Sequence, residues 1–123
     1  MTVIQQADFI DSISSALQHI SYYHPLDFVK ALEKAYELEP EGPARQAMAQ
    51  LLINSKMCAR DHRPICQDTG MVTVYLEVGM AVRWNSDMSV EEMVNTAVRQ
   101  AYQHPRNRLR ASVVADPAGE RIN

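Results

Sequence analysis

The chain has 123 residues, of which 46% are hydrophobic and 22% charged, a length and balance typical of one globular domain with its own core. The formal net charge of −3 argues against a general nucleic-acid binder, which needs a strongly basic face. The sequence has no run of about 18 apolar residues and no basic and apolar start typical of a secretory signal, so we expect a cytoplasmic protein that does not bind membranes.

Three helices are predicted in the first half of the chain, within about residues 7–58. The first begins near Phe9 and ends before His24-Pro25, because a pre-proline residue disfavours helical backbone. Pro25 suits the first turn of the second helix, and Pro43 opens a third that continues to about Cys58. The positions that form their apolar stripes are Phe9, Ile13, Leu17 and Ile20; Phe28, Leu32, Ala35 and Tyr36; and Ala44, Ala47, Met48, Leu51 and Leu52.

The second half begins with a polar loop, residues 59–70, and then alternates between apolar and polar side chains over residues 71–82, which predicts a half-buried strand. Ser89 and Glu92 have the spacing of a capping box, so a fourth helix begins there. It ends before Pro105, and an extended segment follows to about residue 115. We expect these two extended segments to pair, giving an α+β fold in which an N-terminal helical bundle precedes a small strand-helix-strand unit spanning residues 71–115.

Chemistry is concentrated in the loop sequence RPICQDTG, residues 63–70, which presents a thiol, an amide, a carboxylate and a hydroxyl in succession. Such a loop can offer the Cys66 thiolate to a metal while its neighbours reach a bound ligand. The residue types alone leave an alternative open. In it the loop is solvated, Asp68 and Thr69 make local turn hydrogen bonds, and Cys66 is a small buried hydrophobic residue.

The same eight residues resemble the signature around the first cluster cysteine of class I, iron-sulfur-dependent fumarate hydratases. NRLRAS at residues 107–112 resembles the N-x-L-R-x-S segment of that family, and SYYHP and LLINSKMC resemble stretches of its proteobacterial members. The resemblance covers essentially the whole chain. Single-chain members are several times longer and continue past Asn123, so we expect residues 1–123 to be an N-terminal part of the catalytic region, truncated at its C-terminus.

The resemblance implies a role for four residues. Cys66 is expected to be one of three cysteine thiolates that hold a 4Fe-4S cluster. Gln67 and Asp68 match substrate-contacting positions, and Asp68 is also a candidate for proton transfer. Arg110 matches an arginine that clamps a substrate carboxylate, since the LR-x-S register favours it over Arg108.

The implied reaction is the reversible hydration of fumarate to malate in the citric acid cycle, catalysed by a hydro-lyase whose cluster acts as a Lewis acid. The full-length enzyme is expected to be a homodimer acting on a small dicarboxylate. The other cluster cysteines of the family lie downstream of Asn123, so the fragment itself is expected to lack the cluster and to be inactive. Two alternatives stay open: a tartrate dehydratase or related iron-sulfur hydro-lyase, and, in a different class, a small helical interaction or redox module with a reactive Cys66.

Overall fold

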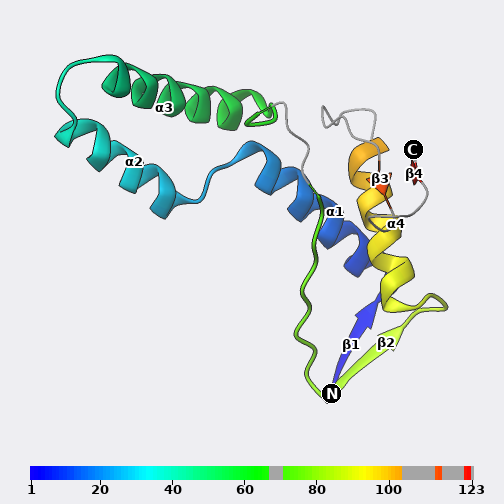
Figure 1. The fold of residues 1–123 in the computed structure, drawn as a ribbon. Coiled ribbons are helices and arrows are strands. Elements are labelled where there is room, and N and C mark those ends of the chain that lie inside the picture. The colour runs from blue at the N-terminus through cyan, green and yellow to red at the C-terminus, as the bar shows by residue number, and fades with distance from the viewer. Residues whose placement is uncertain (67–70, 104–112, 115–120, 123) are drawn as a thin grey trace. The chain divides into compact units, whose positions relative to one another are not determined.

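The computed structural model describes residues 1–66, 71–103, 113–114 and 121–122, and the fold is α+β, as predicted (Figure 1). Its helices are α1 (Gln6–Tyr22), α2 (Leu26–Leu38), α3 (Pro43–Asp61) and α4 (Val90–Gln103). Its strands are β1 (Thr2–Gln5), β2 (Val82–Asn85), β3 (Val113–Val114) and β4 (Arg121–Ile122). The chain divides into two compact units, residues 1–18 with 68–123 and residues 19–67. No described helix combines the length and the apolar character needed to cross a bilayer.

The first unit contains a parallel strand pair, in which β1 and β2 align from Thr2 opposite Val82 to Gln5 opposite Asn85. The Asn85 side-chain amide donates to Gln5 Oε1 at 2.6 Å, which fixes the register at its far end. The predicted strand over residues 71–82 is wrong, because residues 71–79 are not in a strand and β2 begins only at Val82. Among the described strands, β2 pairs with β1, and β3 pairs with β4 in an antiparallel arrangement, whereas most of the second extended segment of the prediction lies outside the described residues.

The core of the first unit lies between α1 and α4. Met93 is fully buried and packs with Ile10 and Ala97, and a neighbouring cluster joins Leu17 to Val98 and Ala101. Phe9 and Trp84 line the first cluster with their rings edge to face, 5.0 Å apart. Most of the predicted α1 stripe therefore faces this core, but its last member does not, because Ile20 lies in the second unit and is 62% exposed.

The capping box of α4 is confirmed at its predicted position. The Ser89 backbone N–H donates to Glu92 Oε2 at 2.7 Å, and the Glu92 N–H donates to Ser89 Oγ at 3.2 Å. These reciprocal bonds lower the pKa of Glu92, chiefly through the bond from the Ser89 backbone and then through its hydroxyl. Two of the donors that a helix N-terminus leaves unpaired are thereby satisfied.

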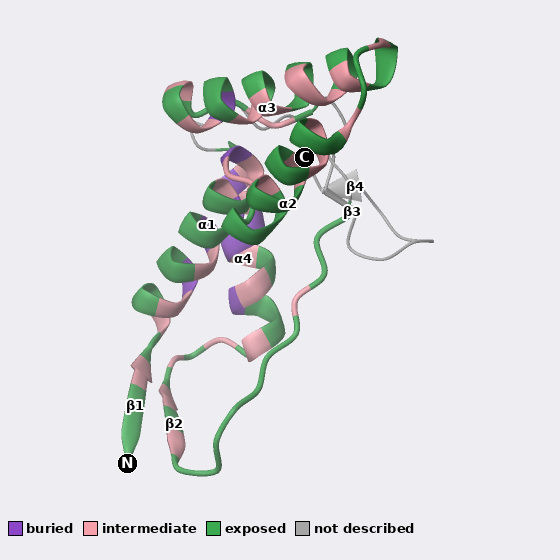
Figure 2. Cartoon of the chain, turned by 90° about the vertical axis from the view of Figure 1, so that its left-hand side faces the viewer, coloured by how far each residue is buried: buried purple, intermediate pink, exposed green. Residues whose placement is uncertain are grey.

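The second unit is built on the helical hairpin of α2 and α3, which run side by side and are joined by residues 39–42 (Figure 1). The hairpin carries little buried surface: no residue of α2 is buried, and Cys58 is the buried residue of α3 (Figure 2). The predicted stripes of these helices are therefore only partly covered, and Phe28 and Leu51 are exposed. The α3 helix continues to Asp61, three residues past its predicted end at Cys58.

Candidate functional site

The predicted site begins where α3 ends. The N–H groups of His62 and Arg63 both donate to the Cys58 carbonyl, the latter at 3.1 Å. This second bond is the 6→1 bond of a Schellman-type helix end, which places one residue in the left-handed region. Here that residue is His62, with φ of 49° and ψ of 55°, where glycine is the usual choice. The turn directs the chain away from α3 and into residues 63–66.

The side chain of His62 is held by two tyrosines from the end of α1 and the residue after it. Tyr23 Oη lies 2.8 Å from His62 Nε2, and the Tyr22 ring stacks on the imidazole with centroids 5.4 Å apart and planes 4° apart. Left-handed backbone costs a residue with a Cβ about 1–2 kcal/mol. These two ring contacts offset that cost and keep the turn after α3 in one conformation.

Both peptide groups that flank Ile65 are held by hydrogen bonds. In the group before it, the Pro64 carbonyl accepts from Cys58 Sγ at 3.4 Å and the Ile65 N–H donates to the Ser21 carbonyl at 3.0 Å. In the group after it, Asn54 Nδ2 donates to the Ile65 carbonyl at 2.8 Å. The Ser21 carbonyl is available because the residue four positions on is Pro25, which has no N–H to give it.

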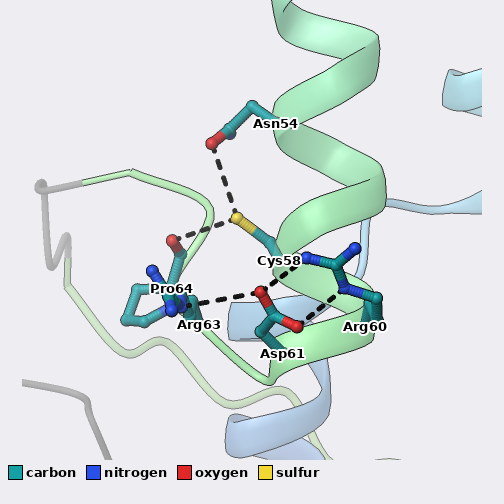
Figure 3. A network of polar contacts seen from close by, with 6 residues as sticks. All are labelled: Asn54, Cys58, Arg60, Asp61, Arg63 and Pro64. Atoms are coloured by element: carbon teal, nitrogen blue, oxygen red, sulfur yellow. Dashed lines mark hydrogen bonds and ion pairs between the residues drawn. The ribbon is translucent and has the colours of Figure 1, made fainter.

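Cys58 serves this arrangement as a buried donor (Figure 3). Its side chain lies between the Pro64 carbonyl and Asn54 Oδ1, at 3.4 Å and 3.6 Å from Sγ, and the residue is only 3% exposed. Burial is the main cause that raises the pKa of the Cys58 thiol, opposed by the nearby Arg63. The group therefore stays protonated at neutral pH, so it is a hydrogen-bond donor and a poor metal ligand.

Charged side chains surround the same turn: Arg60 and Arg63 are exposed, and Asp61 is half-buried. Arg60 pairs with Asp61 at 2.8 Å, and Arg63 Nε lies 3.8 Å from the second Asp61 oxygen (Figure 3). The hydrogen bond to Asp61 and the attraction of its charge raise the pKa of Arg60 further. Exposed pairs of this kind are largely screened by solvent, so they contribute little to the conformation of the loop.

Of the predicted site residues, the structure describes Cys66, which directly follows the held peptide groups and is exposed. Gln67, Asp68 and Arg110 lie outside the described residues, as does Arg108. Within the described part of the chain, no three His, Cys, Asp or Glu side chains gather where a metal ion would fit. Of the two cysteines, Cys66 is exposed, whereas the Cys58 sulfur faces its two oxygen acceptors.

Sequence reasoning missed the part that Asn54 and Cys58 play. The two residues are four apart on α3, so their side chains lie on one face of the helix, next to the loop. That spacing is visible in the sequence. Only the fold reveals that the face is directed at Pro64 and Ile65.

Comparison of the sequence with known proteins identifies its family. The profile of the family described as "Fumarate hydratase (Fumerase)" matches residues 10–123. A putative L(+)-tartrate dehydratase subunit alpha from Methanocaldococcus jannaschii is 28% identical over 74% of this chain and 32% of its own length. A putative fumarate hydratase class I from Geobacillus stearothermophilus is 31% identical over 78% of this chain and 18% of its own length.

The chain therefore spans less than a third of either relative, and no solved structure gives a significant match. The family match extends over nearly the whole chain and includes the turn after α3, the held Ile65 and the exposed Cys66. The chain belongs to the fumarate hydratase (Fumerase) family.

Proposed function

We propose that the chain is part of an iron-sulfur hydro-lyase that adds water to fumarate to give malate, and that Cys66 is one of the thiolates holding its 4Fe-4S cluster. The observation that carries the proposal is the contrast between the two cysteines. Cys66 is exposed on irregular backbone, whereas Cys58 is buried and its sulfur lies 3.4 Å and 3.6 Å from two oxygen acceptors. A cluster bound at Cys66 supplies an iron with Lewis-acid character.

The chain's own groups divide the remaining work between binding and proton transfer. Arg110 pairs with a substrate carboxylate, a task that suits the planar guanidinium because it can donate two parallel hydrogen bonds. Gln67 donates from its amide to a substrate oxygen. Asp68 contacts the substrate and accepts or returns a proton, since hydration of a double bond adds one proton to carbon. The two further thiolates that the cluster requires come from outside these 123 residues, in an enzyme that is a homodimer in the cytoplasm.

Tartrate is a second candidate substrate, favoured by the 28% identity to the tartrate dehydratase subunit alpha. Dehydration of tartrate gives oxaloacetate, whereas dehydration of malate gives fumarate. Assays of the whole enzyme with each substrate separate the two, and the substrate with the larger kcat/KM identifies the reaction. That relative is named a subunit alpha, which indicates that its enzyme contains a second kind of chain.

The test of the proposal compares the two cysteines in the whole enzyme, purified without oxygen. Cys66→Ser is expected to abolish both hydratase activity and the visible absorbance of the cluster, because a cubane missing one of three thiolates is not stable. Cys58→Ser is the matched control. It keeps a hydroxyl donor for the same acceptors and should retain the cluster. Equal losses in both variants would contradict the assignment of the ligand.

The 123-residue chain provides a second control. It has one exposed cysteine, so anaerobic reconstitution with iron and sulfide should give no stoichiometric cluster and no malate. Iron and sulfide analysis checks the first expectation. Turnover by the 123-residue chain would mean that it builds a complete site by itself.

A further inference from the structure

The peptide group between Ile65 and Cys66 accepts a hydrogen bond from the side chain of Asn54. Because a peptide group is planar, the direction of the Ile65 carbonyl also fixes the direction of the Cys66 N–H. That carbonyl accepts from Asn54 Nδ2 at 2.8 Å, and Asn54 is itself oriented by the thiol of Cys58, which lies 3.6 Å from Oδ1. The two Asn54 contacts are consistent with one orientation of its amide, with the nitrogen toward the loop.

The preceding peptide group is held by contacts that do not involve Asn54 directly. Its carbonyl end contacts Cys58 and its N–H end contacts the Ser21 carbonyl. Two planes held on either side of Ile65 restrict its φ and ψ, and they thereby restrict the position of the Cys66 Cα relative to α3. Of the two side-chain bonds to these planes, the one from Asn54 is the bond adjacent to Cys66.

We propose that Asn54 is a positioning residue for the cluster ligand: it sets the Ile65–Cys66 peptide plane and thereby the direction in which Cys66 presents its thiolate and its backbone N–H. This inference rests on the proposed function. Ligand thiolates are tuned by the hydrogen bonds made around them, so a fixed Cys66 N–H affects how tightly the cluster is held. Asn54 itself touches neither cluster nor substrate.

The sharpest variant is Asn54→Asp, which is nearly isosteric. It keeps an oxygen that Cys58 can donate to, and it replaces the donor to Ile65 with a second acceptor. The control is Asn95→Asp, the same change on the exposed face of α4. In the 123-residue chain, the NMR chemical shifts of the Ile65 carbonyl carbon and the Cys66 amide nitrogen, which belong to the peptide group that Asn54 holds, should change in Asn54→Asp and keep their wild-type values in Asn95→Asp.

An internal reference separates positioning from general loss of structure. The Glu39 N–H, bonded to the Ala35 carbonyl at the end of α2, should exchange its hydrogen with solvent at the wild-type rate in both variants. Faster exchange at Glu39 in Asn54→Asp would refute the proposal, because it would mean that the variant destabilises the whole unit. Unchanged chemical shifts at the Ile65 carbonyl and the Cys66 amide would refute it too.

The second measurement follows release of iron to a chelator from the whole enzyme. Release should be about tenfold faster in Asn54→Asp than in Asn95→Asp, and equal rates would overturn the link between Asn54 and the ligand. A failure of the proposed function would give a different result: wild-type enzyme purified without oxygen would contain no cluster at all. That result would overturn both inferences, whereas equal release from a loaded enzyme overturns only this one.

Discussion

Replacing Met93 by alanine tests whether the contact between α1 and α4 stabilises the first unit. Met93 is 0% exposed and packs against Ile10 and Ala97. Removing its side chain beyond Cβ loses apolar burial and leaves a cavity, which costs about 2–5 kcal/mol for a buried methionine. That is a large part of the roughly 5–15 kcal/mol that stabilises a typical domain. At about 4 °C per kcal/mol, Tm should fall by roughly 8–20 °C.

A natural fluorescent reporter for unfolding is present in the chain. Trp84 is the one tryptophan of the chain, and it packs against the same cluster, so its fluorescence follows unfolding of this unit in urea. Met80→Ala is the matched control, since Met80 is 99% exposed and its loss should change the free energy of unfolding by less than about 0.5 kcal/mol. A Met93→Ala variant as stable as wild type, or a Met80→Ala variant equally damaged, would refute the placement of this core.

Three further predictions concern helix ends. Ser89→Ala should cost about 1 kcal/mol in urea unfolding, because the Glu92 N–H loses its cap. Because the pKa of Glu92 is lowered in the folded state, its carboxylate stabilises the fold at pH values above the ordinary glutamate pKa. This stabilisation is lost as the pH falls through the lower pKa of the folded state. Glu92→Gln should therefore reduce the loss of stability that acid causes in the wild type. At the end of α3, His62→Gly and His62→Ala both lose the tyrosine contacts, but only glycine accepts the left-handed backbone readily. The glycine variant should therefore be more stable by about 1 kcal/mol, as measured by far-UV circular dichroism, and equal stability would argue against left-handed backbone at this turn.

The helices were predictable because residues close to their ends in the sequence mark where most of them begin. Pro25 and Pro43 mark two starts, and the Ser89–Glu92 pair marks a third, each within a few residues of where the structure has it. The error at α3, which runs to Asp61, arises because no proline or glycine stands near Cys58 to stop it.

The strands were not predictable from the same local signals. Alternation over residues 71–82 indicates a surface that could pair, but a strand forms only where a partner supplies hydrogen bonds. The partner found by Val82–Asn85 is Thr2–Gln5, a segment too short to show a pattern of its own. A single sequence carries no sign of a pairing across so many residues.

For the site, the order of thiol, amide and carboxylate in residues 66–68 predicts a functional loop, and this role stays a prediction. The environment that distinguishes the two cysteines could not be predicted from the sequence. Cys58 and Cys66 differ in burial because α3 turns its Asn54 and Cys58 face toward the loop, which depends on the tertiary contact between Ile65 and the end of α1. Such tertiary contacts produce no repeating pattern of residues that a sequence would reveal.

The parallel pairing of β1 with β2 has a consequence for how the protein is made. Gln5 and Asn85 are 80 residues apart, so at roughly 5–20 residues per second the ribosome delivers the second strand about 4–16 s after the first. During that interval the apolar side of α1 has no α4 to cover it, whereas the α2–α3 hairpin needs only neighbouring residues and can form at once. Nascent chains should thus be most vulnerable to aggregation, and most in need of a chaperone, between the synthesis of α1 and the emergence of α4.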